Sequence, residues 1–264
     1  MLDIELNKDL LGLVKNKRVA LIGPAPHLVG KNLGRYLDGY DVVCRVNEII
    51  PSPNYRCDYG SRTDVMFHNC ATSYLHTLEN KIDESPKEFA QLKMACCLST
   101  KASNSGDDSN YLSWPDDHVS DVVGNFSKVN VHNIPFYWIG VKDYRNLYNA
   151  IGHQPYSGTS TIAVLSRYPV KELLITGMTF HLNGDSHNEL YIDGHWDKVQ
   201  LAKTSPNGWH GGFHGPGNDR QVKFLKSIMM STESIVVDSV LSDLLKFPQS
   251  NHPRVMKIHH GRGG

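Results

Sequence analysis

The sequence predicts an α/β fold, a single Rossmann-like domain in which helices flank a mostly parallel sheet. Three observations predict it. Short apolar segments recur along the chain, each long enough for one strand. Several are followed directly by Gly, Asn or Pro, which favour turns. Helical stretches separate some of them, as the crossover between two parallel strands requires.

Seven segments are expected to form strands, because each is a short run rich in apolar and β-branched residues. The first reads Arg-Val-Ala-Leu-Ile-Gly, and Pro24 follows it. The expected strands cover residues 18–23, 41–46, 63–67, 92–98, 128–134, 172–176 and 234–237.

Helices are expected between these strands. One follows Pro26 from about His27 to Leu37, and one runs from Ser160 to Arg167, where Pro169 closes it. Another is amphipathic over residues 219–230, and a short one follows the last strand.

Two long segments show little periodicity. Residues 101–121 are rich in Ser, Asp and Asn and are expected to form a surface loop or insertion. Residues 181–218 are rich in Gly, His and Asn and are expected to form an active-site loop region. Residues 1–264 are expected to form one domain, since their length fits one large α/β unit.

The composition excludes several classes of protein. The chain has 27 Lys and Arg against 27 Asp and Glu, so it lacks the basic excess of a protein that binds nucleic-acid phosphates or anionic membranes. It is 40% hydrophobic, which is too apolar for a disordered chain. No apolar run approaches the length of a transmembrane helix. The 14 His are the unusual feature, because they titrate near neutral pH.

The cysteines predict a reducing compartment. The five Cys all precede residue 100, their number is odd, and none forms a Cys-x-x-Cys pair. Buried, reduced thiols are therefore expected. The first eight residues contain Asp3 and Glu5 and do not form a signal peptide. A cytoplasmic location is expected from these two observations.

Small and amide residues follow four of the expected strands, namely Gly23, Asn47, Asn69 and Gly177. Ligands of open α/β sheets bind beyond the carboxyl ends of the strands. A glycine at such a turn lets the main chain approach a phosphate or sugar, although a tight turn in any α/β protein has the same pattern. The dinucleotide fingerprint Gly-x-Gly-x-x-Gly is not met at Gly23.

A longer pattern over residues 18–69 is more specific. The Gly23-Pro-Ala-Pro turn precedes a strand that ends in Arg45-Val-Asn47, and then comes an Asp58-x-Gly60-x-x-Thr63 segment. These three spaced elements resemble the long sialyl motif of the sialyltransferase family.

A second segment, Pro155-Tyr-Ser-Gly-Thr159, is followed by an expected helix and by the strand that ends at Gly177-Met178. Its Ser and Thr residues are good helix caps, and the same N–H groups can bind an anion. The segment resembles the short sialyl motif, which implies that it holds the nucleotide of a CMP-linked donor.

Two histidine motifs follow in the family's order. His195-Trp-Asp resembles its His-aromatic-aromatic-acid element, and His214-x4-Asp219 resembles its very short motif, with Asp in place of Glu. A zinc site at His210 and His214 is disfavoured, because Gly211 and Gly212 oppose a helix and no His-Glu-x-x-His pattern occurs. No metal ligands are therefore assigned.

The resemblance implies a glycosyltransferase A-like variant of the fold and an inverting, metal-independent transferase without a cofactor. It would move a 2-keto sugar acid, sialic acid, from a CMP-activated donor to a hydroxyl of a glycan or glycolipid acceptor. His214 would be the general base and His195 would stabilise the leaving phosphate. The implied or expected donor-site residues are Gly23, Pro24, Ala25, Asn47, Asn69, Ser157, Gly158, Thr159, Gly177 and Met178, with Arg45 as the one cation beside them.

Two features depart from the family. Pro24 replaces the turn asparagine that contacts the donor, and the cysteine that pairs with the long motif is missing from the short one. Three alternatives stay open. They are a CMP-Kdo-dependent transferase, a methyltransferase that uses an adenosyl cofactor, and a non-catalytic protein that binds nucleotides or glycans.

Overall fold

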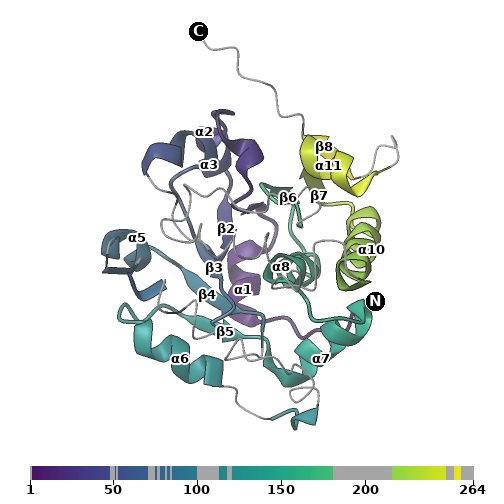
Figure 1. Cartoon of the computed structure of the whole chain (residues 1–264). Helices are drawn as coiled ribbons and strands as arrows, with labels where there is room; N and C mark the ends of the chain where they lie inside the picture. Colours follow the sequence, from purple (N-terminus) through teal and green to yellow (C-terminus); the bar gives the residue numbers. More distant parts are fainter. Residues whose placement is uncertain are drawn as a thin grey trace, which may run out of the picture.

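A computed structural model describes residues 2–47, 51, 53–70, 75, 78–80, 82–83, 85–99, 113–117, 121–180, 216–247 and 253–256. Within these ranges the chain forms one eight-stranded sheet in the order β5-β4-β3-β2-β1-β6-β7-β8, and all neighbouring strands are parallel (Figure 1). The strands are β1 (Arg18–Ile22), β2 (Val42–Val46), β3 (Val65–Phe67), β4 (Met94–Cys97), β5 (Phe136–Trp138), β6 (Glu172–Thr176), β7 (Ile235–Asp238) and β8 (Arg254–Met256). The predicted fold class, a parallel sheet flanked by helices, is confirmed.

Helices connect the strands and cover both faces of the sheet. They are α1 (Lys8–Val14), η1 (Pro26–Leu28), α2 (Gly34–Asp38), η2 (Pro53–Tyr55), α3 (Arg56–Tyr59), α5 (Pro86–Ala90), α6 (Asp121–Val129), α7 (Gly140–Ile151), α8 (Ser157–Leu165), α10 (Pro216–Ser231) and α11 (Ser239–Leu245). Figure 1 shows α5 and α6 on one side of the sheet and α8 and α10 on the other. None of the helices in the described ranges is long and apolar enough to span a bilayer.

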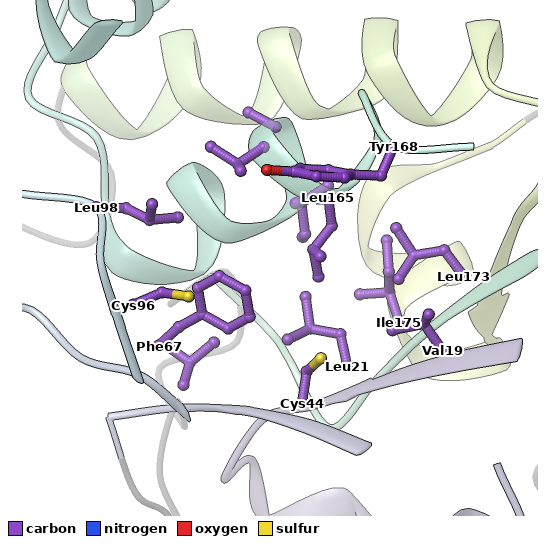
Figure 2. Packing of buried hydrophobic residues seen from close by; sticks show 14 of the residues in the cluster. Val19, Leu21, Cys44, Phe67, Cys96, Leu98, Leu165, Tyr168, Leu173 and Ile175 are labelled. Carbon is purple, nitrogen blue, oxygen red and sulfur yellow. The ribbon is translucent and has the colours of Figure 1, made fainter. Parts of the chain in front are cut away.

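Both faces of the central strands are buried, which explains why these strands are largely apolar rather than alternating. In β1, Val19 and Leu21 join the cluster that contains α7, α8 and α10, whereas Ala20 and Ile22 join the cluster beneath α2 and α3. Figure 2 shows the first cluster, in which Leu21, Cys44 and Phe67 lie between the sheet and Leu165 of α8. This packing fixes α8 over the centre of the sheet.

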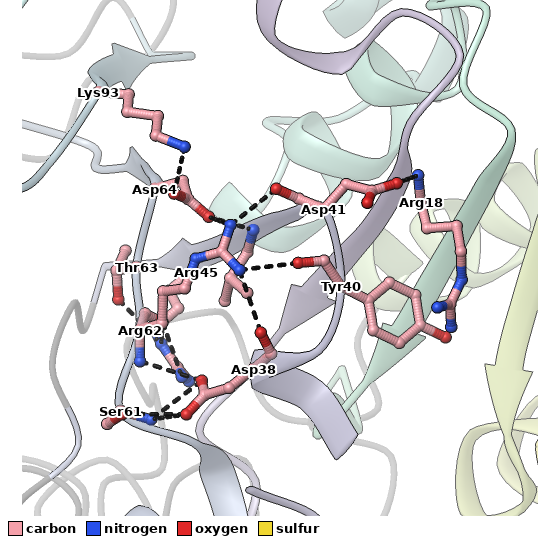
Figure 3. A network of polar contacts seen from close by, with 11 residues as sticks. Arg18, Asp38, Tyr40, Asp41, Arg45, Ser61, Arg62, Thr63, Asp64 and Lys93 are labelled. Atoms are coloured by element: carbon pink, nitrogen blue, oxygen red, sulfur yellow. Dashed lines mark hydrogen bonds and ion pairs between the residues drawn. The ribbon is translucent and has the colours of Figure 1, made fainter. Parts of the chain in front are cut away.

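A network of charged groups lies where the strands begin (Figure 3). The buried Asp64 accepts a hydrogen bond from Val43 N at 2.8 Å and pairs with Arg62 at 2.7 Å and Lys93 at 2.9 Å. Arg62 also donates to the main-chain oxygens of Asp38, Tyr40 and Asp41. These bonds tie together the segments that enter β2, β3 and β4.

The expected helix over residues 27–37 is wrong. The structure has η1 and α2 there, separated by Gly30 and Asn32 in the left-handed region, with φ of 73° and 54°. The N–H groups of Gly30 and Asn32 donate to the carboxylate of Asp58 at 2.9 and 2.8 Å. Because these bonds replace helical ones, the segment bends around Asp58.

The expected strand over residues 128–134 is also wrong. Residues 121–129 form α6, whose Val122, Phe126 and Val129 share one buried face, and the fifth strand follows as β5. The loop expected over residues 101–121 therefore ends at α6. The structure also adds α1, α5, α7 and β8, none of which was expected.

All five cysteines are free, and four of them are buried as expected. Cys57 is exposed, which corrects the expectation for that residue. Cys44, Cys70, Cys96 and Cys97 lie in or directly beyond the central strands, where burial raises the pKa of the Cys44 and Cys96 thiols.

Candidate functional site

The order in which strands are added to the sheet reverses at its centre, between β1 and β6. Strands β2 to β5 extend from β1 in one direction, and β6 to β8 extend from it in the other. In open α/β folds, ligands bind beyond the carboxyl ends of adjacent strands whose connections leave for opposite sides. We call this expected binding region, beyond the ends of β1 and β6, the crevice. Gly23 follows β1 and Gly177 follows β6, so both predicted glycines border this crevice.

The two glycine turns touch each other. Gly23 N donates to Thr176 O and Ala25 N donates to Gly177 O, both at 2.8 Å. A Cβ on Gly23 would collide with Gly177 O, and one on Gly177, whose φ is +68°, would collide with Gly23 O. Tyr59 Oη donates to Ala25 O at 2.7 Å and fixes the turn from the other side. The turns require glycine because main chain meets main chain.

The amino terminus of α8 borders the same crevice. A Cβ on Gly158 would lie 3.4 Å from Phe180 Cε1 and 3.7 Å from Met178 Sδ, and the Met178 side chain also contacts Gly23. The predicted residues Gly23, Gly158, Gly177 and Met178 are thus brought together, although residues 23 and 158 are far apart in sequence.

The helix cap expected from a Ser or Thr of this segment does not form. The N-cap residue is Tyr156, which makes no side-chain cap bond, and Ser157 is the first residue of α8. The N–H groups of the first helical turn have no intrahelical acceptor and carry the positive end of the helix dipole. This end of α8 can therefore accept an anion.

Two of the predicted residues hold buried oxygens that lack a partner. Asn47 follows β2 in the left-handed region, with φ of 59°, and its Oδ1 is buried without a hydrogen bond. Thr159 Oγ1, on α8, is likewise buried and unpaired, and α8 packs against β2. A buried polar atom without a partner is costly, so these oxygens mark a place where a polar ligand improves the structure.

Arg45 does not serve the site as expected. Its guanidinium is fully buried and donates to Tyr59 O at 2.7 Å, to Arg62 O, and to Thr63 Oγ1 at 3.0 Å. The Asp58, Gly60 and Thr63 pattern therefore has a structural role. Asp58 bends the segment after η1, Tyr59 holds the glycine turn, and Thr63 helps to satisfy the buried arginine.

Asn69 lies apart from the crevice. It follows β3, which is two strands away from β1, or about 10 Å at the usual strand spacing. Its carbonyl accepts a hydrogen bond from Cys97 Sγ at 3.4 Å. Among the remaining predicted residues, Pro24 and Ala25 lie in the first glycine turn. His195 and His214 lie outside the described residues, as does most of the loop predicted over residues 181–218. Helix α10 begins at Pro216, two residues after His214.

No role was predicted for Asp238, yet this buried carboxylate lies at the end of β7, beside β6. It was detectable in principle, because it directly follows the last predicted strand and polar residues at such positions face the crevice. Its partner His27 was concealed within a segment predicted to be helical.

Comparison with known proteins gives three results. Residues 8–101 match the model of glycosyltransferase family 29 (sialyltransferase). No curated protein matches the chain. Among solved structures, the chain is similar to a mammalian sialyltransferase in complex with Gal-beta-1-3GalNAc-ortho-nitrophenol (15% identity, TM-score 0.45, covering 88% of this chain and 73% of that one). It is also similar to a second structure of a mammalian sialyltransferase (17% identity, TM-score 0.45, covering 89% and 73%). Over residues 8–101 the chain is therefore similar to the sialyltransferases of glycosyltransferase family 29.

Proposed function

We propose that the chain, as one glycosyltransferase domain over residues 1–264, moves sialic acid from a CMP-activated donor to a hydroxyl of a glycan or glycolipid. The observation that carries this proposal is the meeting of Gly23, Gly177 and the start of α8 at the crevice between β1 and β6. The match of residues 8–101 to the sialyltransferase family model supports the sialyl-transferring chemistry.

The donor nucleotide fits the chemistry of this crevice. The open N–H groups at Ser157, Gly158 and Thr159 suit the phosphate of CMP. The unpaired Asn47 Oδ1 and Thr159 Oγ1 suit the polar groups of ribose and cytosine. The two glycine turns, with Pro24, Ala25 and Met178, let the nucleotide approach the main chain closely. In this proposal Asn69 serves the outer part of the donor site.

The proposed reaction is a single displacement with inversion. His214 removes the proton from the acceptor hydroxyl, and the oxygen attacks the anomeric carbon of the sugar acid. The bond from that carbon to the phosphate oxygen breaks, and CMP leaves with the electron pair. His195 and the α8 N–H groups stabilise the charge on the departing phosphate.

Metal independence is part of the proposal, because the sequence contains no Asp-x-Asp pair of the kind that binds a divalent metal in other nucleotide-sugar transferases. Transfer is expected to persist in the presence of excess EDTA. Loss of transfer in EDTA that Mg²⁺ or Mn²⁺ restores would show that a metal takes part.

A ligand screen followed by transfer assays tests the function. Thermal shift with CMP, CDP, UDP, GDP and an adenosyl cofactor should show the largest stabilisation with CMP. CMP-sialic acid and CMP-Kdo are then assayed in parallel, with sialic acid expected as the transferred sugar. Stabilisation by the adenosyl cofactor alone would favour a methyltransferase. Binding of CMP without transfer or donor hydrolysis would indicate a binding protein.

His214→Ala tests the proposed base. Turnover should fall about 10²–10⁴-fold, as is typical when a general base is removed, while CMP binding stays unchanged. His259→Ala, in a histidine outside every motif, is the matched control. Near-normal turnover of His214→Ala would exclude His214 as the base.

A further inference from the structure

The carboxylate of Asp238 is placed where it can organise the crevice. It lies at the end of β7 and its side chain is fully buried. A buried carboxylate is tolerated only when hydrogen bonds and charge compensate for lost hydration. Burial by itself raises the pKa of this carboxyl. The hydrogen bond and electrostatic attraction from His27, together with donors from Leu241 and Thr176, outweigh that effect and hold its pKa below the ordinary value.

The two oxygens of Asp238 do different things. Oδ1 accepts from Leu241 N at 2.7 Å and caps α11. Oδ2 accepts from Thr176 Oγ1 at 2.8 Å, from Gly177 N at 3.0 Å and from His27 Nε2 at 3.0 Å. Capping a helix requires only the first oxygen. Oδ2 accepts hydrogen bonds from three donors, none of which belongs to α11.

Those three donors come from the two segments that meet at the crevice. Thr176 and Gly177 form the end of β6, and His27 belongs to η1, directly after the Gly23 turn. The main-chain contact of Gly23 with Gly177 therefore lies between two segments that are also tied to the same oxygen. Asp238 and His27 are 211 positions apart, so only the folded chain forms this link.

The one hydrogen bond given for the His27 ring among the described residues is the bond to Asp238. Its Nε2 donates to Asp238, and its Nδ1 is buried without a partner. The side chains of the turn before it, Gly-Pro-Ala-Pro, offer no hydrogen-bonding group. The imidazole is therefore the first side chain after β1 that can anchor the turn to the far side of the crevice.

We infer that Asp238 and His27 are positioning residues for the donor, and that Oδ2 of Asp238 sets the spacing of the two glycine turns against which the nucleotide binds. The inference rests on the proposed function and assigns neither residue a contact with the reacting atoms. Loosening the link should weaken donor binding, because the turns then lose their preformed spacing. It should leave turnover at saturating donor nearly unchanged.

The experiment uses variants that separate the two oxygens. Asp238→Ser keeps an oxygen that can cap α11 and removes the second oxygen. His27→Phe keeps a flat ring and cannot donate, whereas His27→Gln can still donate from its amide nitrogen. Asp243→Asn, an exposed carboxylate on α11, is the matched control. For each protein the Kd for CMP, KM for the donor, kcat and the free energy of unfolding in urea are measured.

Asp238→Ser and His27→Phe are each expected to raise Kd and KM at least about tenfold, the effect of losing one hydrogen bond to a charged group. His27→Gln should recover most of this loss, and Asp243→Asn should match the wild type. The double variant should be little worse than either single variant, because both remove the same link.

Two outcomes separate this inference from the proposed function. If the wild type does not bind CMP, the proposed function fails and the positioning role fails with it. If the wild type binds CMP and the variants bind it equally well while unfolding at lower urea, the pair is only structural and the inference alone is overturned. The side chain of His27 is 12% exposed, whereas that of Asp238 is fully buried, so His27→Phe still tests the inference where Asp238→Ser does not fold.

Discussion

Two groups of polar side chains at opposite ends of the strands are satisfied in opposite ways. At the edge where strands begin, Asp64 satisfies its carboxylate with Val43 N, Arg62 and Lys93 (Figure 3). At the edge where strands end, Asn47 and Thr159 keep buried oxygens unpaired. A paired network stabilises the fold, whereas unpaired groups cost free energy unless a ligand meets them. The contrast indicates that stability and binding are assigned to different ends of the same strands.

The largest effect on stability is expected at the edge of the sheet where the strands begin. Asp64→Ala should lower the free energy of unfolding by about 3 kcal/mol, chiefly because Val43 N loses a charged acceptor in the interior. The ion pairs add less, since the side chains of Arg62 and Lys93 are 36% and 49% exposed. Urea unfolding measures the change, and Asp64→Asn, which keeps an acceptor, should recover part of it. An altered Kd for CMP would contradict the separation of the two edges.

Gly23→Ala tests the contact between the two glycine turns, at the edge of the sheet where the strands end. The new Cβ collides with Gly177 O, so the turns must separate, at a cost of about 2 kcal/mol for forced repacking. The same shift should weaken CMP binding by at least about tenfold. Calorimetric titration measures the binding. Gly124→Ala, where a Cβ meets nothing within 4 Å, is the control and should bind CMP normally. Equal affinity in both variants would show that the glycine contact does not shape the site.

A pH titration sharpens the comparison at the end of β3. Burial lowers the pKa of His68 to about 4, and its Nδ1 accepts a hydrogen bond from Cys70 N at 3.0 Å. The unfolded chain, with a histidine pKa near 6.5, binds the proton more readily. Stability is therefore complete above about pH 6.5 and falls toward pH 4 by at most about 1.4 kcal/mol per unit.

His68→Asn keeps an acceptor for Cys70 N and removes this titration. The difference between its free energy of unfolding and that of the wild type, followed from pH 7 to pH 4.5, should narrow as the pH falls. A difference that stays constant across this range would mean that His68 takes up its proton as readily in the folded protein as in the unfolded chain.

The smallest effect is expected from Thr159→Val. The substitution removes a buried hydroxyl that has no partner, so stability should rise by up to about 1 kcal/mol. CMP affinity should fall severalfold if the hydroxyl binds the nucleotide. Thr161→Val is the control, since Thr161 Oγ1 donates to Ser157 O at 2.7 Å and its loss should reduce stability. A stabilised Thr159→Val with unchanged affinity would remove Thr159 from the donor site.

The sequence predicted the strands well because a strand buried on both faces is a short apolar run, as in β1, β2 and β6. It failed where a distant side chain decided the backbone. Asp58 captures the N–H groups of Gly30 and Asn32 and prevents the helix that local propensity favours. It also missed α7, although Val141, Tyr144, Leu147 and Ile151 form one buried face.

The residues of the candidate site also divide into those that the sequence could predict and those that it could not. Gly23, Asn47 and Gly177 were predictable because a residue that directly follows a strand must lie at the ending edge. The partners of Arg45 were not predictable, because they are the main-chain oxygens of Tyr59 and Arg62 and the hydroxyl of Thr63, in a segment some 15 residues away. The pairing of His27 with Asp238 required the order of the strands.

The contact of Gly23 with Gly177 also limits how this protein can be redesigned. Each residue already lacks a side chain, so a larger residue at one position cannot be accommodated by a smaller one at the other. A library aimed at a different donor nucleotide gains nothing from diversity at either glycine. Pro24 directly follows Gly23 and is only partly buried, so variation in this turn is better placed there than at either glycine.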